Sequence, residues 1–365
     1  MSRAVIGMDA HAGEGRLTGL GMYVRHLVRE LEKISSPDFD LRFYKRKNSE
    51  KDFNTPARLR WENCQLPKLA AKDRLDLLHI PAFAPPFLKT SRSVVTVHDL
   101  IGMLFPNQLG AASAFYWGKW LPWTVKKADF LIADSEYTRR DLVTHLRIPE
   151  KKIRVIYPGV PENFTPAISE PLYRSVCERL AIRSPYFLFV GTLEPRKNLK
   201  RVLEAFRLFL DRVPEGKEHQ LVVAGSRDFA HGRFFKDLSA ALSFNPGQII
   251  FTGYLEHSEL NALYARALAF LYPSLYEGFG FPVLEAMSAG APVLTSATTS
   301  IPEVAGDAAL LVDPLDIKAI SEGMKRLAED RSYRKDLVEK GFQRMRRFSW
   351  RKTAEETLDV YRDLL

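Results

Sequence analysis

Residues 277–285 read Glu277-Gly-Phe-Gly-Phe-Pro-Val-Leu-Glu285, two carboxylates eight positions apart on either side of a glycine-aromatic loop. Proline suits the first position of a helix, because its φ is already helical and its missing N–H would have no partner there. Pro282 therefore predicts a helix over residues 283–289, closed by Gly290 as a left-handed C-cap. Glu277 then precedes the loop, and Glu285 falls in the first helical turn.

The loop between these carboxylates has the properties of an anion site. Backbone N–H groups, including those of Gly280 and Phe281, would point out of the helix N-terminus, where the helix dipole is positive. A phosphate suits that position, and flanking carboxylates accept hydrogen bonds from sugar hydroxyls. The pattern fits a diphosphate that carries a sugar at each end. The alternative is a capped surface helix with an acidic first turn, which helices favour in any case.

On both sides of this stretch, short apolar runs alternate with helical patterns, which is typical of parallel βαβ units. A proline-rich segment without periodicity, residues 158–166, separates two such series and is a candidate linker. We therefore expect an α/β protein with two doubly wound domains, residues 1–165 and 166–348, whose ligands bind at the carboxyl ends of strands facing a cleft. The expected strands are Ala4–Met8, Leu41–Tyr44, Leu77–Ile80, Val94–Val97, Phe130–Ala133, Arg154–Tyr157, Tyr186–Val190, Leu221–Ala224, Ile249–Phe251, Ala269–Tyr272, Val293–Thr295 and Ala309–Val312.

The helical patterns are equally regular. Ser135 is a typical N-cap for the helix that should follow it. The expected helices are Leu20–Ile34, Glu136–Leu146, Asn198–Val213, Ser258–Ala267, Asp316–Glu329, Ser332–Arg346 and Ser349–Leu365.

The composition, with 46% hydrophobic and 27% charged residues among 365, is that of an ordinary globular protein. No apolar run approaches membrane-spanning length, and the apolar run at the N-terminus is too short for a signal peptide. Cys64 and Cys177 have neither metal-ligand nor redox spacing, so a reducing cytoplasmic location is expected. We expect a soluble protein or one bound peripherally to the inner face of the cytoplasmic membrane.

The net charge of +9 is unevenly distributed. Residues 1–165 carry 26 Lys and Arg against 18 Asp and Glu, a net +8, and the remaining residues carry 27 against 26, a net +1. A basic half favours an anionic partner, such as a phospholipid surface or a lipid-diphosphate acceptor, whereas no module for nucleic-acid recognition accompanies the charge. The alternative is that the charge only confers solubility. The basic residues include Arg42, Lys45, Arg46, Lys47, Lys51, Lys126 and Lys127.

Three further motifs follow or precede predicted elements. Gly191-Thr-Leu-Glu-Pro-Arg-Lys-Asn198 follows a strand and opens a helix, so Arg196 and Lys197 can place two cations on a diphosphate. His98 follows the strand Val94–Val97 at its carboxyl end, where ligand-binding residues of such folds gather. Gly19-Leu20-Gly21 opens the first helix, where backbone N–H groups can approach a phosphate or a sugar hydroxyl; a structural turn is the alternative.

Together with Tyr272-Pro-Ser-Leu-Tyr276 and Ser300-Ile-Pro-Glu-Val304, these stretches resemble the signatures of the retaining glycosyltransferases of family 4, which have the GT-B fold. The resemblance covers nearly the whole chain in the family's order. It implies that the last helix crosses back, so that residues 349–365 join the first domain. It also implies that a hexose moves from a nucleoside diphosphate sugar to a hydroxyl without a covalent intermediate, the leaving phosphate accepting the proton.

The resemblance assigns a role to each motif. Glu285 would hold the ribose, and the transferred sugar would contact Glu277 and His98. Arg196 and Lys197 would hold the diphosphate as it departs, with His98, Glu277, Arg196 and Lys197 as the catalytic set. The loop Gly19–Gly21 would lie between acceptor and donor phosphate. The remaining donor contacts would come from Gly191, Gly278, Phe279, Gly280 and Phe281.

Among similar families, the pattern most resembles bacterial mannosyltransferases of surface polysaccharide assembly. This resemblance implies GDP-mannose as donor, a lipid-linked or lipopolysaccharide-type oligosaccharide as acceptor, and no metal or other cofactor. Donors such as UDP-glucose, UDP-galactose and UDP-N-acetylglucosamine stay open. So does a nucleotide-sugar 2-epimerase of the same fold. A catalytically dead partner subunit is disfavoured, because the clamp and both glutamates are present.

Two segments are interpreted as structural. Asp38-Phe-Asp40 imitates the metal-binding aspartate pair of the other large glycosyltransferase fold, but we expect a turn there and no metal. Residues 115–127, Phe-Tyr-Trp-Gly-Lys-Trp-Leu-Pro-Trp-Thr-Val-Lys-Lys, mix aromatics with lysines, as helices at membrane interfaces do. Core packing uses the same residue types, and by resemblance to a buried family helix we favour the core.

Overall fold

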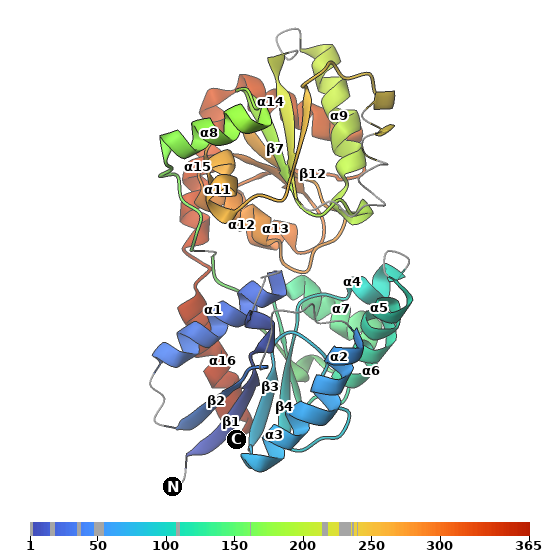
Figure 1. Cartoon of the computed structure of the whole chain (residues 1–365), viewed down its shortest axis with the longest axis vertical. Helices are drawn as coiled ribbons and strands as arrows, with labels where there is room; N and C mark the ends of the chain where they lie inside the picture. Colours follow the sequence, from blue (N-terminus) through green and yellow to red (C-terminus); the bar gives the residue numbers. More distant parts are fainter. Residues whose placement is uncertain are drawn as a thin grey trace. The chain divides into compact units, whose positions relative to one another are not determined.

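The computed structural model describes residues 3–14, 19–34, 38–46, 55–106, 110–160, 162–213, 218–225, 235, 237–238 and 240–365. These residues divide into two compact units, Met1–Gly159 with Phe348–Leu365, and Val160–Arg347 (Figure 1). The division falls inside the proline-rich segment 158–166, and the last helix belongs to the first unit. Lys47 and Lys51, two of the basic residues noted in the sequence, lie outside the described residues.

The described strands of the first unit form one parallel sheet in the order β2-β1-β3-β4-β5-β6 (Figure 1). Helices pack on both faces, so the central strand β4 is buried from its second residue on, and four of its six residues are valine or threonine. The strands are β1 (Ala4–Asp9), β2 (Phe39–Tyr44), β3 (Leu77–Ile80), β4 (Arg92–Val97), β5 (Phe130–Ala133) and β6 (Ile153–Val155).

The helices of the first unit include two continuous runs that each contain one wider π turn, residues 55–72 and 111–125. The α-helices are α1 (Gly19–Lys33), α2 (Thr55–Arg60), α3 (Leu66–Lys72), α4 (Ile101–Leu104), α5 (Ala111–Phe115), α6 (Leu121–Val125), α7 (Glu136–Leu146) and α16 (Trp350–Leu364). The π segments are η2 (Trp61–Gln65) and η4 (Tyr116–Trp120), and the 3₁₀ turns are η1 (His11–Gly13) and η5 (Glu150–Lys152).

The second unit repeats the pattern with a parallel sheet in the order β12-β11-β10-β7-β8-β9. The strands are β7 (Tyr186–Val190), β8 (Gln220–Ala224), β9 (Ile249–Gly253), β10 (Ala269–Tyr272), β11 (Val293–Ser296) and β12 (Leu310–Val312). The helices are α8 (Glu170–Leu180), η6 (Pro195–Lys197), α9 (Leu199–Arg212), α11 (His257–Arg266), α12 (Phe281–Ser288), α13 (Ile301–Ala305), α14 (Ile317–Glu329) and α15 (Arg331–Met345).

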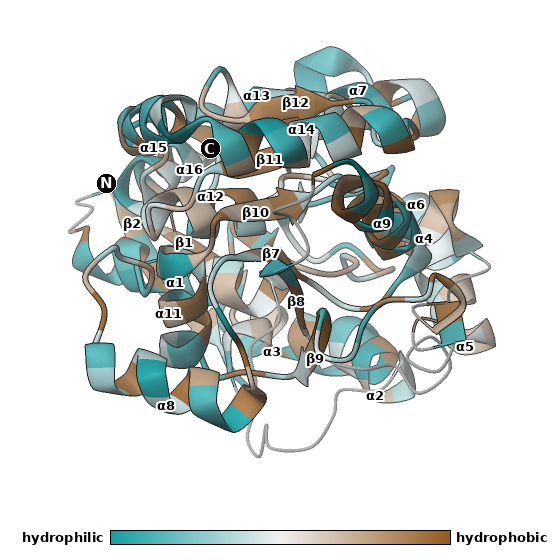
Figure 2. Cartoon of the chain, turned by 90° about the horizontal axis from the view of Figure 1, so that it is seen from above, coloured by the Kyte–Doolittle hydropathy of each residue, from teal (hydrophilic) through white to brown (hydrophobic). Residues whose placement is uncertain are grey.

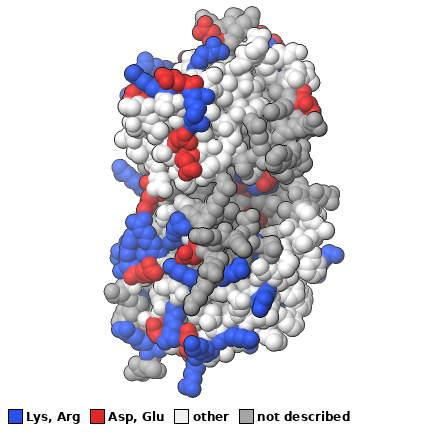
Figure 3. Space-filling view, viewed as in Figure 1, with Lys and Arg blue, Asp and Glu red and all other residues white. Residues whose placement is uncertain are grey.

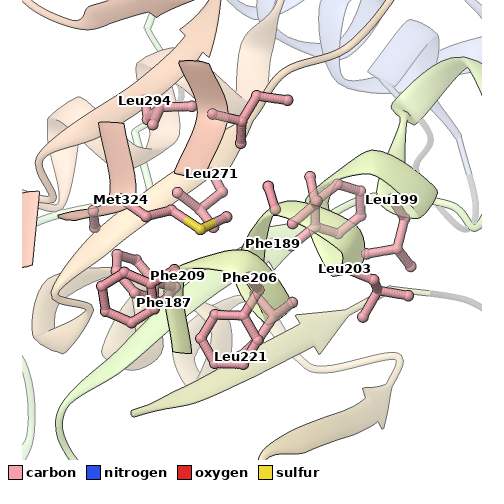
Figure 4. Packing of buried hydrophobic residues seen from close by; sticks show 14 of the residues in the cluster. Phe187, Phe189, Leu199, Leu203, Phe206, Phe209, Leu221, Leu271, Leu294 and Met324 are labelled. Carbon is pink, nitrogen blue, oxygen red and sulfur yellow. The ribbon is translucent and has the colours of Figure 1, made fainter. Parts of the chain in front are cut away.

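The core of the second unit lies between the sheet and helices α9 and α14. Buried residues on α9 recur at helical spacing and meet the phenylalanines of β7, as Figure 4 shows for Phe206, Phe209 and Phe187. Figure 2 shows the same division by hydropathy: strand β10 is hydrophobic, whereas helix α8 carries alternating hydrophilic and hydrophobic bands. This packing fixes the strand ends from which the site loops emerge.

The C-terminal helix α16 is fastened to the first unit by polar as well as apolar contacts. Trp350 stacks on His26, with ring centroids 4.9 Å apart, and the Thr353 hydroxyl donates to the Tyr157 carbonyl at 2.7 Å. The Tyr361 hydroxyl lies 2.6 Å from Nδ1 of His79 in β3. Burial lowers the pKa of His79 to about 3, so this histidine is neutral. His79 thus links β3 to α16.

Several predicted boundaries are corrected by the structure. Strand β6 begins at Ile153 and ends at Val155, rather than spanning residues 154–157. Strand β2 begins at Phe39, so Asp40 lies inside a strand and not in the turn that the sequence indicated. The Asp40 carboxylate pairs with Arg42 in the same strand, and Asp38 pairs with Arg362 of α16. Both aspartates therefore have structural partners.

The interpretation of residues 115–127 as core is only half right. Tyr116, Leu121 and Val125 are buried in the main cluster of the first unit. Phe115 and Trp123, on the opposite face, are among the exposed large hydrophobic residues. The segment is thus a helix with one buried face and one largely exposed face.

Candidate functional site

The side chain of Glu277 collects hydrogen bonds from two loops of the second unit. It lies in the loop between β10 and α12 and is only 7% exposed. Its Oε1 accepts hydrogen bonds from Lys197 Nζ at 2.7 Å and from Arg196 Nη1 at 3.1 Å. The same oxygen accepts from the hydroxyls of Tyr272 at 2.8 Å and Ser274 at 2.6 Å. The sequence motifs around residues 196 and 277 therefore meet at one carboxylate.

Strand pairing explains why these motifs meet. Strands β7 and β10 are neighbours in the sheet, so the loops that follow them emerge side by side at its carboxyl edge. Two backbone contacts join the loops, since the Arg196 carbonyl accepts from Leu275 N at 2.8 Å and from the Ser274 hydroxyl at 3.1 Å. The Asn198 amide adds donors to the carbonyls of Pro273 and Pro314, at 2.9 and 2.6 Å.

The electrostatics of this cluster are those of a tight buried ion pair. Burial alone would raise the pKa of Glu277, but the Lys197 and Arg196 cations outweigh burial and lower the pKa to about 2. Burial lowers the pKa of Lys197, and the Glu277 carboxylate offsets that effect in part. Arg196 also donates from Nε to Glu194 at 2.7 Å. Lys197 also donates to the Tyr272 hydroxyl, and Arg196 Nη1 also donates to the Tyr276 carbonyl at 3.4 Å.

Helix α12 begins at Phe281, one residue before Pro282, which the sequence indicated as its first position. Gly280 is its N-cap, with a left-handed φ of 110° that favours glycine, and Phe281 is the first helical residue. Pro282 is therefore at the second position and Glu285 in the second turn, which corrects the expected first-turn place of this carboxylate. The Ser300 hydroxyl donates to the carbonyls of Glu277 and Phe279, at 2.9 and 3.0 Å, and braces the loop. The backbone between the two carboxylates is thus held in place.

Glu285 differs electrostatically from Glu277. The Tyr264 hydroxyl donates to its Oε2 at 3.2 Å. Burial raises the pKa of Glu285 from 4.5 to about 7, against the lowering effects of Tyr264 and the Lys197 charge. The site therefore holds one strongly ionised carboxylate and one that changes its charge near neutral pH.

Gly191 lies directly after β7, and its N–H donates to the Ala224 carbonyl at 3.0 Å. Its position places the start of the Arg196–Lys197 loop at the carboxyl edge of the sheet. Phe279 and Phe281 stack edge to face on either side of Gly280, with centroids 5.3 Å apart. Gly278 lies in the loop from β10 to α12, and Phe281 begins the helix.

His98 lies in the first unit, after β4, and its ring is held on both sides. Nδ1 is 2.5 Å from the Asp134 carboxylate and Nε2 is 2.8 Å from the Pro81 carbonyl. Both neighbours are acceptors, so both ring nitrogens carry hydrogen. Burial disfavours this charged form, but Asp134 outweighs burial and raises the pKa of His98. The His98 carbonyl accepts from the Thr138 hydroxyl at 3.1 Å.

Gly19, Leu20 and Gly21 form the first turn of α1, as the sequence predicted for this loop. The Asp99 carboxylate accepts from Ile101 N at 2.9 Å, which begins α4. The structure places these residues and His98 in the first unit, and Arg196, Lys197, Glu277 and Glu285 in the second.

Sequence reasoning missed the hydroxyl donors of the cluster. Tyr272 and Ser274 donate to Glu277, Tyr264 donates to Glu285, and Ser300 braces the loop. Tyr272 and Ser274 lie within the segment 272–276 that carried part of the resemblance. The alternation of polar residues at the end of that strand was the feature of the sequence that could have indicated these donors. Among the described residues, no group of three or more His, Cys, Asp or Glu lies close enough to hold a metal ion. None of the described helices has both the length and the apolar character to cross a membrane.

Comparison with known proteins gives a consistent result for both units. Residues 17–164 match the family model of "Glycosyltransferase Family 4", and residues 178–344 match "Glycosyl transferases group 1". The chain is similar to O-antigen chain mannosyltransferase B of Escherichia coli, with 31% identity over 301 residues, covering 80% of this chain and 76% of that protein. It is 29% identical over 290 residues to the serotype-specific mannosyltransferase WbdA of Escherichia coli, covering 78% of this chain but only 35% of that longer protein.

Among solved structures, sucrose-phosphate synthase from Thermosynechococcus elongatus superposes with a TM-score of 0.74 at 20% identity, covering 99% of both chains. At that identity the likeness concerns the fold alone, and the two six-stranded parallel sheets with flanking helices are those of the GT-B fold. The paired-glutamate stretch, the two family models and the 31% identical relative agree. The chain belongs to family 4 of the glycosyltransferases and is a hexosyltransferase with the GT-B fold.

Proposed function

We propose that this enzyme is a retaining mannosyltransferase, which moves mannose from GDP-mannose to a hydroxyl of a lipid-linked or lipopolysaccharide-type oligosaccharide. The observation that carries the proposal is the convergence of Arg196 and Lys197 on the first glutamate of the pair, Glu277. The choice of mannose is supported by similarity to the two Escherichia coli proteins named as mannosyltransferases.

In the second unit, the donor is proposed to lie along the carboxyl edge of the sheet, over Gly191 and residues 278–281. Arg196 and Lys197 would hold the diphosphate, and their charges would stabilise it as it leaves. Glu277 already fixes both cations at about 3 Å, so little reorganisation is needed when the leaving group gains charge. Glu285 would accept hydrogen bonds from the ribose.

In the first unit, His98 and the turn Gly19–Gly21 are proposed to contact the transferred sugar and the acceptor. Both ring nitrogens of His98 are engaged by Asp134 and Pro81. We therefore propose that His98 acts as a fixed cation near the transferred sugar, rather than as a general base. The nucleophile is the acceptor hydroxyl, and its proton passes to the departing diphosphate.

The basic first half is proposed to favour an anionic membrane surface and a lipid-linked acceptor. On the face drawn in Figure 3, Lys and Arg side chains gather on the first unit. Lys45 is paired with Glu14 at 3.2 Å, but its side chain is half exposed. Solubility alone is the competing explanation for this charge.

The experiment that tests the proposal is a panel of GDP-mannose, UDP-glucose, UDP-galactose and UDP-N-acetylglucosamine, each with and without a lipid-linked oligosaccharide acceptor. We expect acceptor-dependent transfer from GDP-mannose with retained anomeric configuration, and undiminished transfer in excess EDTA. Transfer from a UDP-sugar, and not from GDP-mannose, would show that the proposed donor is wrong. Conversion of the nucleotide sugar to its 2-epimer without any acceptor would show that the enzyme is an epimerase and not a transferase.

A further inference from the structure

An aromatic and lysine-rich surface in the first unit has no part in the proposed chemistry. It consists of Phe87 and Leu88 in the loop between β3 and β4, of Trp120 and Trp123 on the helical run 111–125, and of Lys127 in the turn that follows. The exposed fractions are 68% for Leu88, 45% for Trp123 and 43% for Phe87. Large apolar side chains of this size are rarely left together on a surface without a function. We call these five residues the aromatic patch.

The members of the aromatic patch pack on one another from two separate parts of the chain. The rings of Phe87 and Trp123 stack with centroids 5.2 Å apart, and Trp120 lies 5.5 Å from Trp123. The ammonium of Lys127 is 3.9 Å from the Phe87 centroid and 3.7 Å from that of Trp123. Trp120 is half-buried, whereas Phe87 and Trp123 stay exposed although these contacts hold their rings in place, which is the arrangement of a preformed contact surface.

The helical run 111–125, which carries Trp120 and Trp123 of this patch, is amphipathic because of its spacing. Phe115, Lys119, Trp123 and Lys127 recur every four residues and are exposed. The wider π turn at Tyr116–Trp120 keeps this four-residue spacing on one face. The opposite face of the helical run, which includes Tyr116 and Val125, is buried in the core. The exposed face therefore results from the sequence and is not a consequence of poor packing.

The charge around the patch is strongly positive. Residues 85–92 and 115–129 contain five cations and one carboxylate, Asp129, a net +4. Lys89 pairs with Asp129 at 2.5 Å, and its side chain is still half exposed. A cavity of about 160 Å³ opens beside Phe87, between residues 85–91 and Lys127. The five cations are Lys89, Arg92, Lys119, Lys126 and Lys127.

We propose that the aromatic patch binds an anionic phospholipid membrane, with Phe87, Leu88 and Trp123 entering the headgroup region and the surrounding lysines contacting lipid phosphates. Exposed aromatic rings with flanking lysines match both properties of that interface, an apolar interior and a negative surface. A protein partner would need a complementary acidic face as well as apolar pockets. The inference assigns a surface to the membrane contact proposed above, and it does not depend on the donor sugar.

The test is co-sedimentation of the whole protein with phosphatidylcholine vesicles that contain or lack phosphatidylglycerol, without donor or acceptor. We expect binding only with phosphatidylglycerol, and a loss of at least about tenfold in partitioning for Phe87→Ser combined with Leu88→Ser, since each exposed apolar side chain contributes about a factor of ten. The matched control is Leu315→Ser, an exposed leucine of the second unit at 60%, which should bind as the wild type does. Brominated lipids should quench the tryptophan fluorescence of the wild type more than that of Trp123→Phe.

Each outcome decides the matter. Unchanged partitioning of the Phe87/Leu88 variant, or an equal loss in Leu315→Ser, would overturn the inference. So would a wild-type dimer that becomes a monomer in the Phe87/Leu88 variant while vesicle binding is absent, because the patch would then bind a second copy. Thermal melting, and transfer to a short soluble acceptor where it is measurable, separate misfolding from lost binding. Failure of transfer on every acceptor with intact vesicle binding would count against the proposed function alone.

Discussion

At the scale of single residues, the two glutamates of the site differ in charge. Glu277 has a lowered pKa because it forms a buried ion pair with Lys197, whereas burial raises the pKa of Glu285. Removal of one partner from a buried pair costs about 3–5 kcal/mol when the other charge is left without compensation, and Arg196, 3.1 Å from Glu277, offsets part of that cost when Lys197 is lost. Lys197→Met should therefore lower the stability of the fold as well as transfer, and adding Glu277→Gln should restore the melting temperature but not the transfer rate. Chemical denaturation and initial rates measure the two effects separately.

Arg196→Ala provides the matched comparison, because Lys197 would still neutralise Glu277. We expect a loss of about 10²–10³ in transfer rate, the usual effect of losing one charge-assisted contact to a developing charge, with a smaller loss of stability. Near wild-type turnover of Arg196→Ala would remove this residue from the proposed clamp. A double variant at 197 and 277 that stays as unstable as Lys197→Met would contradict the ion-pair argument.

The raised pKa of Glu285 predicts how the stability of the fold changes with pH. Its pKa is raised from 4.5 to about 7 in the folded protein, so the folded carboxyl binds its proton more tightly than the unfolded one. The stabilising effect of that proton is complete below pH 4.5 and is lost as the pH rises to about 7. We expect the wild type to lose melting temperature between pH 5 and 8 relative to Glu285→Gln. Glu339→Gln, on the exposed side of α15, should follow the wild-type curve, and identical curves for all three proteins would contradict the argument.

At the scale of elements, strands and helices could be predicted because their signals are local. Ser135 accepts from Thr138 N and begins α7 at the predicted residue. The predicted start of α12 was one residue late, because the loop before the helix is braced by a long-range contact, from the Ser300 hydroxyl to the Phe279 carbonyl 21 residues away. The partners of Glu277 could not be predicted from the sequence for the same reason, since they depend on which strands are neighbours in the sheet.

The junction with α16 gives a prediction at this scale. A Cβ on Gly159 would lie 2.3 Å from the Trp350 backbone nitrogen and 2.4 Å from its ring, so Gly159→Ala must push the start of the helix away. Overpacking of this kind costs about 1–3 kcal/mol. At Gly110, before α5, a Cβ would meet nothing within 4 Å, and Gly110→Ala should cost less than about 1 kcal/mol. Equal melting temperatures for the two variants would show that the close approach at Gly159 carries no energetic weight.

At the scale of the whole molecule, composition and alternation of elements predicted two doubly wound sheets, and the order of strands within each sheet came only from the structure. The first unit is built from two separate parts of the chain, Met1–Gly159 and Phe348–Leu365, whereas the second is continuous. Each unit has its own buried cluster. Continuity should therefore decide which unit can fold by itself.

We accordingly expect residues 160–347 to fold as an isolated fragment and to melt cooperatively. Residues 1–159 alone should not, because removal of α16 uncovers Tyr23 and His26 and takes away the Tyr361 partner of the buried His79. Joining residues 348–365 to residue 159 through a flexible glycine-serine linker should restore cooperative melting, followed by circular dichroism. The same linker carrying Trp350→Ser and Tyr361→Phe is the control, and it should restore less. If residues 1–159 melted at the same temperature with and without the helix, α16 would be an accessory to the first unit and not part of its core.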